Sequence, residues 1–163
     1  MIRSAAAAFA ALMLLSGATK VRADDAVVRG AYLVRIIGCG DCHTLGYFFG
    51  RPDMTKALAG SDVGFASPDF GTRWPPNLTP DKETGLGTWT EEQIVTALRS
   101  GIRPDGRQLA PIMPYNDLAS LTDQDAHAIA AYLKSLPPVR NAVQKPVPPG
   151  EKAPPPYMTI IMQ

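Results

Sequence analysis

The chain of 163 residues contains only two cysteines and two histidines, and three of these four residues lie within Cys39-Gly40-Asp41-Cys42-His43. This C-x-x-C-H pattern is typical of covalent attachment of a c-type haem. Two cysteines at this spacing lie on one side of a helical turn, where both thiols can form thioethers with the vinyl groups of a porphyrin. The histidine that follows can donate a ring nitrogen to the iron. The motif therefore requires a fold that surrounds a large apolar macrocycle.

The two cysteines admit three other interpretations. A redox-active C-x-x-C of the thioredoxin kind requires a βαβ setting, and the sequence shows no such pattern. A zinc site requires four ligands, but the only further histidine is His127, and neighbouring Cys42 and His43 fit poorly into one tetrahedron. A disulfide between Cys39 and Cys42 would leave His43 unexplained. Haem attachment is therefore favoured.

Residues 1–23 have the three parts of a secretory signal peptide. Arg3 gives the positive start, residues 5–15 are apolar, and residues 21–23 form a candidate cleavage site, with residues 16–18 as an alternative. The apolar run is short for a membrane span, although an uncleaved anchor is also compatible with it. Cleavage would remove three of the 16 Lys and Arg residues and none of the 15 Asp and Glu residues, so the net charge would change from +1 to −2. This predicts a periplasmic protein and argues against nucleic acid as a partner.

Three later segments carry the signals of helices: residues 24–37, 90–100 and 122–136. In the first, apolar side chains recur at helical spacing, and Gly30 favours the close approach of another helix. The second begins with a capping box formed by Thr90 and Gln93. The third is capped by Thr122 and contains Tyr132, which is placed to pack across the first helix near Gly30.

Residues 44–87 show no sustained period, and a loop of this length is usually functional or wrapped around another group. Its aromatic side chains suit a macrocycle, although each one alone is better explained as ordinary core: Tyr47, Phe48, Phe49, Phe65, Phe70 and Trp74.

The C-terminal tail, residues 139–163, follows the last predicted helix and is rich in proline. Residues 137–163 contain eight of the 16 prolines, so the segment is expected to run extended. Its apolar end, residues 157–162, docks on this domain, docks on a partner or stays disordered; the sequence leaves these alternatives open.

Met113 is a candidate for the second axial ligand of the iron. It lies between Pro111 and Pro114, in a stretch that cannot be helical throughout. A thioether sulfur is a soft donor that favours ferrous iron and raises the reduction potential. A methionine of the core is an equally good interpretation of these residues alone. His127 is the rival ligand, although a histidine within a helix is more often a surface residue.

Five stretches, taken in order, resemble the class I cytochromes c, and most of all a haem module of the cytochrome c subunits of membrane-bound bacterial alcohol and polyol dehydrogenases. They are C-G-D-C-H at 39–43, P-P-N-L-T-P-D at 75–81, T-G-L-G-T-W-T at 84–90, P-I-M-P-Y at 111–115 and A-A-Y-L-K-S-L-P-P-V at 130–139. The resemblance implies thioethers at Cys39 and Cys42, His43 as proximal ligand and Met113 as distal ligand. It also implies that the Pro76 carbonyl accepts a hydrogen bond from His43.

The fold expected from this resemblance is an all-α cytochrome c domain over residues 24–138, with three main helices and long loops around one covalently bound haem. The expected function is one-electron transfer from an exported dehydrogenase to a terminal acceptor such as an oxidase or another cytochrome, with peripheral membrane association allowed. Two side-chain ligands on the iron would leave no place for a substrate, so an enzyme is not expected.

Two other functions are compatible with the sequence. One is a tightly bound electron-entry subunit of a periplasmic or membrane-bound dehydrogenase, which the apolar end of the tail would favour. The other is a haem enzyme such as a peroxidase, which requires an open iron site and usually a second haem, whereas the sequence contains one C-x-x-C-H motif.

Overall fold

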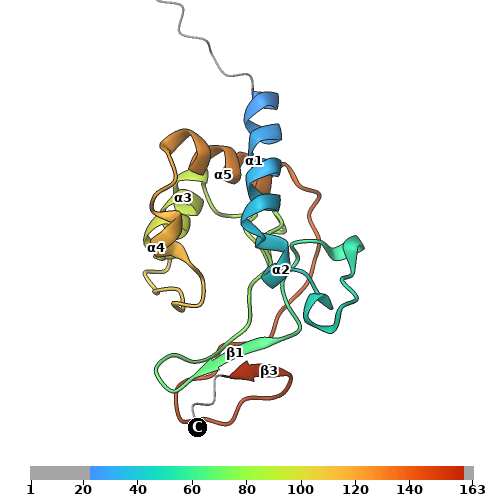
Figure 1. Ribbon diagram of the computed structural model, residues 1–163, viewed down its shortest axis with the longest axis vertical. Helices are drawn as coiled ribbons and strands as arrows, with labels where there is room; N and C mark the ends of the chain where they lie inside the picture. The colour runs from blue at the N-terminus through green and yellow to red at the C-terminus, as the bar shows by residue number, and fades with distance from the viewer. Residues whose placement is uncertain (1–22, 160–163) are drawn as a thin grey trace, which may run out of the picture.

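A computed structural model describes residues 23–159, and it places the long helices at one end of the molecule and a small sheet at the other (Figure 1). The helical end contains α1 (Ala23–Ile37), α3 (Glu91–Ser100), α4 (Tyr115–Leu118) and α5 (Asp123–Ser135). Helix α2 (Cys39–His43) lies between the two ends, and two 3₁₀ turns follow it, η1 (Tyr47–Phe49) and η2 (Met54–Lys56). None of the helices formed by residues 23–159 has the length and apolar character needed to cross a membrane.

Helices α1 and α5 cross at Gly30. A Cβ atom at this position would overlap the backbone carbonyl of Ala128 and lie 2.7 Å from the Cβ of Tyr132. The absence of a side chain therefore permits the contact, as the sequence predicted. An ion pair between Arg29 Nε and Asp125 Oδ1, 2.8 Å apart, joins the two helices beside this crossing.

The long helices begin and end within one residue of the predicted segments. Helix α3 has the predicted capping box, in which Thr90 Oγ1 accepts a hydrogen bond from Gln93 N and Gln93 Oε1 accepts one from Thr90 N. It ends at Gly101, which has a left-handed φ of 68°. Helix α5 is capped by Thr122. Apolar side chains from all three helices form the main core: Leu33, Val34, Ile94, Leu98, Ile129 and Leu133.

The fold is predominantly helical, as the sequence predicted, and it also contains a small sheet that the sequence did not predict. Three short strands, β1 (Gly64–Ser67), β2 (Gly71–Arg73) and β3 (Tyr157–Thr159), form a sheet in the order β2-β1-β3. Strand β1 pairs antiparallel with β2 and parallel with β3. Strands of three or four residues are too short to show an alternating pattern, and the pairing of β1 with β3 joins distant parts of the chain. The sequence pattern therefore gave no sign of them.

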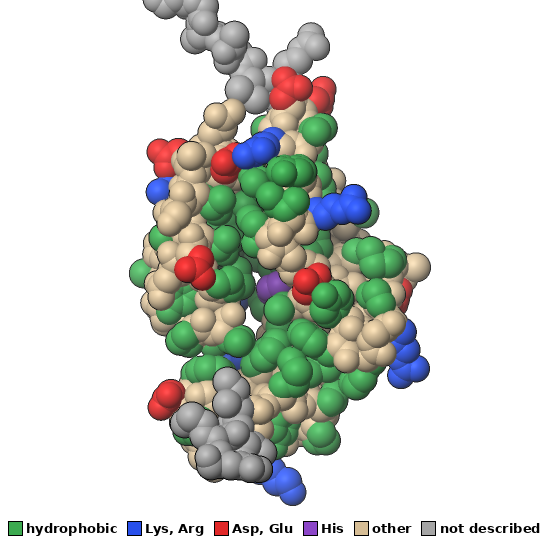
Figure 2. Space-filling view, in the orientation of Figure 1, with side chains coloured by type: hydrophobic (Ala, Val, Ile, Leu, Met, Phe, Trp, Pro, Cys, Tyr) green, Lys and Arg blue, Asp and Glu red, His purple; other side chains and the backbone are tan. Residues whose placement is uncertain are grey.

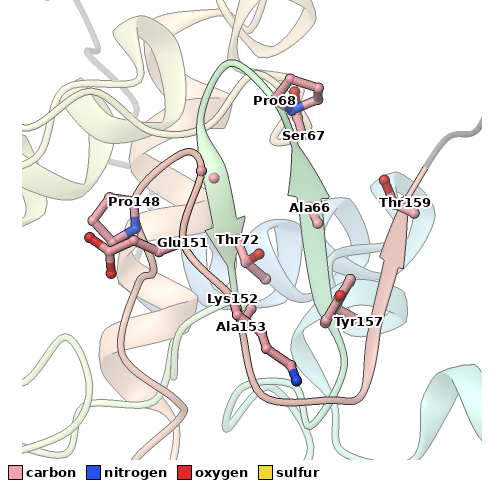
Figure 3. A pocket seen from close by; sticks show the side chains of 12 residues that line it. Ala66, Ser67, Pro68, Thr72, Pro148, Glu151, Lys152, Ala153, Tyr157 and Thr159 are labelled. Atoms are coloured by element: carbon pink, nitrogen blue, oxygen red, sulfur yellow. The ribbon is translucent and has the colours of Figure 1, made fainter.

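The C-terminal tail docks on its own domain, as far as residue 159. Val147 pairs with Thr72 on the outer side of β2 through two backbone hydrogen bonds of 2.9 and 3.0 Å. The tail then passes Pro148, Lys152 and buried Ala153 and returns as β3 beside β1 (Figure 3). The tail thus lies along both sides of the β1–β2 hairpin. Residues 160–163, which include part of the predicted apolar end, and the predicted signal peptide up to residue 22 lie outside the described residues.

Several aromatic side chains of residues 44–87 pack in this sheet end of the molecule. The Phe48 ring lies edge-to-face on Phe65, with centroids 5.6 Å apart, and on Tyr47, with centroids 5.5 Å apart. Trp74 is 5% exposed and covers Gly64 of β1. Trp74 therefore belongs to the core, whereas Tyr47 is 38% exposed and Phe49 is 51% exposed.

Candidate functional site

The C-x-x-C-H motif forms the short helix α2, which follows α1 after a sharp turn. Gly38 makes this turn with a φ of 79°, a conformation that glycine adopts without strain. Cys39 and Cys42 lie on one face of α2, three residues apart, and both are free thiols of intermediate burial. His43 ends the helix and is only 6% exposed. The histidine of the motif is therefore buried, whereas its two thiols are partly accessible to solvent.

The orientation of the His43 ring is fixed by one hydrogen bond. Its Nδ1 lies 2.7 Å from the carbonyl oxygen of Pro76, the bond that the family resemblance implied. A carbonyl oxygen can only accept, so Nδ1 carries the proton and donates it. Burial lowers the pKa of His43, against a smaller opposing effect of the bond to Pro76. The ring is therefore neutral at physiological pH, and its Nε2 keeps a free lone pair, which is the form that binds a metal.

The loop that presents this carbonyl, residues 75–80, is here called the Pro76 loop. Two of its polar side chains are buried, Asn77 and Thr79, each 1% exposed. Asn77 Nδ2 donates to Thr84 Oγ1 at 3.0 Å and to the Val139 carbonyl at 2.7 Å. Sequence reasoning missed Asn77 as a site residue. Its position next to Pro76 in the P-P-N-L-T-P stretch was the only available signal.

The cysteines do not have the properties of redox-active thiols. Burial raises the pKa of Cys39 to about 11, and it also raises the pKa of Cys42. Reactive C-x-x-C pairs instead have a lowered thiol pKa, because the thiolate is the nucleophile. Within residues 23–159 no three His, Cys, Asp or Glu side chains are grouped so that they could hold a metal ion. The thioredoxin-like and zinc interpretations thus gain no support from these residues.

Met113 lies in a second loop, residues 110–114, here called the Met113 loop, which leads into α4. The backbone N–H of Met113 donates to the Ala110 carbonyl at 2.9 Å, and that of Tyr115 donates to the Met113 carbonyl at 2.8 Å. Met113 is partly buried and packs against the same core cluster as Cys39. On the face of the molecule that Figure 2 shows, a histidine lies in a hollow bordered by apolar side chains.

His127, the rival ligand, is engaged elsewhere. It lies on α5 with its side chain 42% exposed. Its Nδ1 is 2.7 Å from the backbone carbonyl of Asp123, and its Nε2 is 2.8 Å from Glu92 Oε1 on α3. The hydrogen bond to Glu92 is the main reason that the pKa of His127 is raised. Both ring nitrogens therefore have partners within a surface link between two helices.

Comparison with known proteins identifies the fold family. The sequence profile described as Cytochrome c matches residues 27–137. The chain belongs to the cytochrome c family. Its cofactor is covalent haem c, since the domain carries a C-x-x-C-H motif at Cys39, Cys42 and His43.

Several relatives are longer proteins that contain a similar cytochrome c segment. The cytochrome c subunit of alcohol dehydrogenase (quinone) from Gluconobacter oxydans is 40% identical over 129 residues, which cover 78% of this chain and 25% of that protein. The fructose dehydrogenase cytochrome subunit of Gluconobacter japonicus is 39% identical over 140 residues, covering 78% and 27%. One of the subunits of nicotinate dehydrogenase from Pseudomonas putida is 39% identical over 113 residues, covering 69% and 9%. The chain thus spans about a quarter or less of these relatives.

A buried donor without a partner also fits a haem. Arg103 Nε is buried and has no hydrogen-bond partner among the described residues, although it forms an ion pair with Asp105 Oδ2 at 3.6 Å. The guanidinium lies over the Trp89 ring, 5.1 Å from its centroid, and Trp89 packs against the core cluster that Cys39 and Met113 also contact. Haem carries two propionate carboxylates, and a buried guanidinium N–H is a donor suited to them. The sequence did not single out Arg103, because its burial arises only in the folded chain.

Proposed function

We propose that this cytochrome c is a periplasmic electron carrier, which accepts single electrons from a dehydrogenase and passes them to a terminal acceptor through a His/Met-ligated haem. The observation that carries the proposal is the state of His43. The ring is buried and neutral, and it donates from Nδ1 to Pro76. This leaves Nε2 as the metal-binding atom on the same helix as both thiols.

Each site residue has a separate role in this proposal. Cys39 and Cys42 would hold the haem through two thioethers, and His43 and Met113 would bind the iron. When bound, haem c supplies a ferric/ferrous couple that exchanges one electron. The Pro76 carbonyl makes His43 a more basic ligand. Because side chains would fill both axial positions, no substrate could reach the iron, so the protein would act as a carrier and not as an enzyme.

The proposed partners follow from the names of the relatives. Those proteins are cytochrome subunits of alcohol and fructose dehydrogenases and one of the subunits of nicotinate dehydrogenase. A dehydrogenase is accordingly the proposed donor, and an oxidase or another cytochrome the acceptor. Residues 1–23 would direct export. A permanently bound electron-entry subunit is an equally consistent alternative, since the relatives are themselves subunits, and it would also allow peripheral contact with a membrane.

The test replaces Met113 by alanine in the haem-loaded protein. If Met113 binds the iron, M113A should keep its haem through Cys39 and Cys42, lose the weak far-red sulfur-to-iron band of the ferric form, and bind carbon monoxide when reduced. Its reduction potential should fall, because a soft thioether that favours ferrous iron has been removed. Optical spectra with and without carbon monoxide, together with a redox titration, measure all of these changes.

A matched control is Met54→Ala, since Met54 is 70% exposed in a surface turn. M54A should have the spectrum of the wild type. Carbon monoxide binding by the wild type, or an unchanged M113A spectrum, would rule out Met113 as the ligand. The proposal would then give way to ligation by His127, if the M113A spectrum is unchanged, or to an open and catalytic iron site, if the wild type binds carbon monoxide.

A further inference from the structure

The Pro76 loop is joined to a segment that lies beyond the matched cytochrome c region. This segment, residues 139–147, is here called the strap. The Val139 carbonyl accepts from Asn77 Nδ2, and the Val139 N–H donates to Thr79 Oγ1 at 3.1 Å. The Asn141 N–H donates to Thr84 Oγ1 at 3.0 Å. The strap therefore forms polar contacts with the residues directly after Pro76.

The hydrogen-bonding capacity of Asn77 is completely used in this arrangement. Its two N–H groups donate to Thr84 Oγ1 and to the Val139 carbonyl. Its side-chain oxygen accepts from Thr79 N at 2.9 Å and from Thr79 Oγ1 at 2.8 Å. An amide can make at most about four such bonds. A buried side chain with every bond filled holds its backbone in one position, because any shift would leave a polar group unpaired.

Thr84 is the junction between the loop and the strap. Its hydroxyl oxygen accepts from Asn77 Nδ2 and from Asn141 N, both at 3.0 Å, and its proton goes to Asp81 Oδ1 at 2.7 Å. One hydroxyl thus links the residue that follows Pro76 to the strap. Its removal would leave two donors without an acceptor while changing little of the apolar packing.

The strap also holds the segment on the other side of His43. Asn141 Nδ2 donates to the Ala59 carbonyl at 2.8 Å. The neighbouring Gly60 N–H donates to the His43 carbonyl at 2.9 Å, and the Ser61 N–H donates to the Pro75 carbonyl at 3.0 Å. Asn141 is therefore connected through Ala59 and Gly60 to the backbone of His43, and through Thr84 and Asn77 to the carbonyl that His43 contacts.

We infer that the strap and Asn77 position His43, so that the C-terminal tail sets the electron-donating strength of the proximal ligand. Asn77, Thr84 and Asn141 are positioning residues in this scheme, since they act through the Pro76 carbonyl. The inference rests on the proposed ligation of the iron by His43. A firmly held carbonyl keeps the Nδ1–H bond short and makes the imidazole a more basic ligand, and a more basic ligand favours ferric iron.

The test compares Thr84→Val with Thr84→Ser in the haem-loaded full-length protein. T84V removes the hydroxyl and keeps the size, whereas T84S keeps the hydroxyl. T84V should have a higher reduction potential than the wild type, because His43 becomes a weaker donor. The Nδ1 proton of His43, followed by NMR in the ferrous state, should exchange with solvent about fivefold faster, as expected for the loss of one neutral hydrogen bond. T84S should match the wild type in both measurements.

Asn141→Ala provides a second variant in case T84V folds poorly, since it removes the bond to Ala59 and leaves Thr84 intact. It should shift both the potential and the exchange rate in the same direction. If T84V or N141A loses stability while the potential and the proton exchange stay at wild-type values, the strap is only structural and the inference is wrong. Failure of the proposed function would give a different result, because the spectrum of the wild-type protein itself would then lack the features of His/Met ligation.

Discussion

The Pro76 loop and the Met113 loop differ in how firmly the polypeptide holds them. The backbone and side chains of the Pro76 loop bond to distant segments: Pro75 to Ser61, Pro76 to His43, Leu78 to Leu58, and Asn77 to Val139. The hydrogen bonds of Met113 are local, to Ala110 and Tyr115. Asn77 is 1% exposed, whereas Ile112 is 51% exposed.

This difference indicates two ways of supplying a ligand to one metal. The Pro76 loop fixes its carbonyl through the chain itself, so His43 is oriented by protein contacts. Met113 packs against the core but its hydrogen bonds are local, so the position of its sulfur would depend on a bond to the iron. The contrast can be tested by removing the haem and by substituting residues of each loop.

The largest effect is expected when the haem is removed from the protein. The variant Cys39→Ala/Cys42→Ala lacks both attachment points, and its haem should be extracted by acid acetone, whereas wild-type haem should stay bound. The haem-free chain should show no cooperative thermal transition by circular dichroism. The reason is that the haem supplies the central apolar surface and stabilises only the native state. A cooperative, native-like melt would mean that the contacts of the Pro76 loop suffice without the cofactor.

A smaller effect should separate the two loops in the haem-loaded protein. Asn77→Ala removes the four hydrogen bonds of a buried side chain and leaves the Thr79 N–H without its acceptor, so the free energy of unfolding should fall by about 3 kcal/mol. Ile112→Ala changes an exposed side chain and should cost less than about 0.5 kcal/mol. Urea unfolding curves of the two variants measure both values. Equal losses would show that the Met113 loop is held as firmly as the Pro76 loop.

The smallest effect is expected at His127, which belongs to neither loop. Its pKa is raised by Glu92, so the protonated ring stabilises the folded state at low pH, and this contribution is lost as the pH rises through the folded-state pKa. Because the pair is exposed, His127→Gln should reduce stability by less than about 0.5 kcal/mol near pH 5.5. The difference from the wild type should vanish near about pH 9. A change in the haem spectrum of H127Q would instead identify His127 as a ligand and overturn the contrast between the loops.

The sequence alone determined the features that depend on neighbouring residues. The spacing of Cys39, Cys42 and His43 indicated the haem. Helical periodicity and the caps at Thr90 and Thr122 located the long helices, because capping bonds form between residues three positions apart. The resemblance to class I cytochromes c supplied Pro76, and the structure contains its bond to His43. Met113 as the second ligand stays a prediction.

The tertiary structure decided the features that depend on distant segments. Strand β3 exists because the tail returns to β1, and neither segment has a pattern that would reveal it alone. The tail docks on its own domain through residues such as Val147 and Asn141. Asn77 became important only when folding buried it and brought Val139 to its side-chain amide. Burial and long-range pairing are properties of the whole chain, and no local stretch of sequence encodes them.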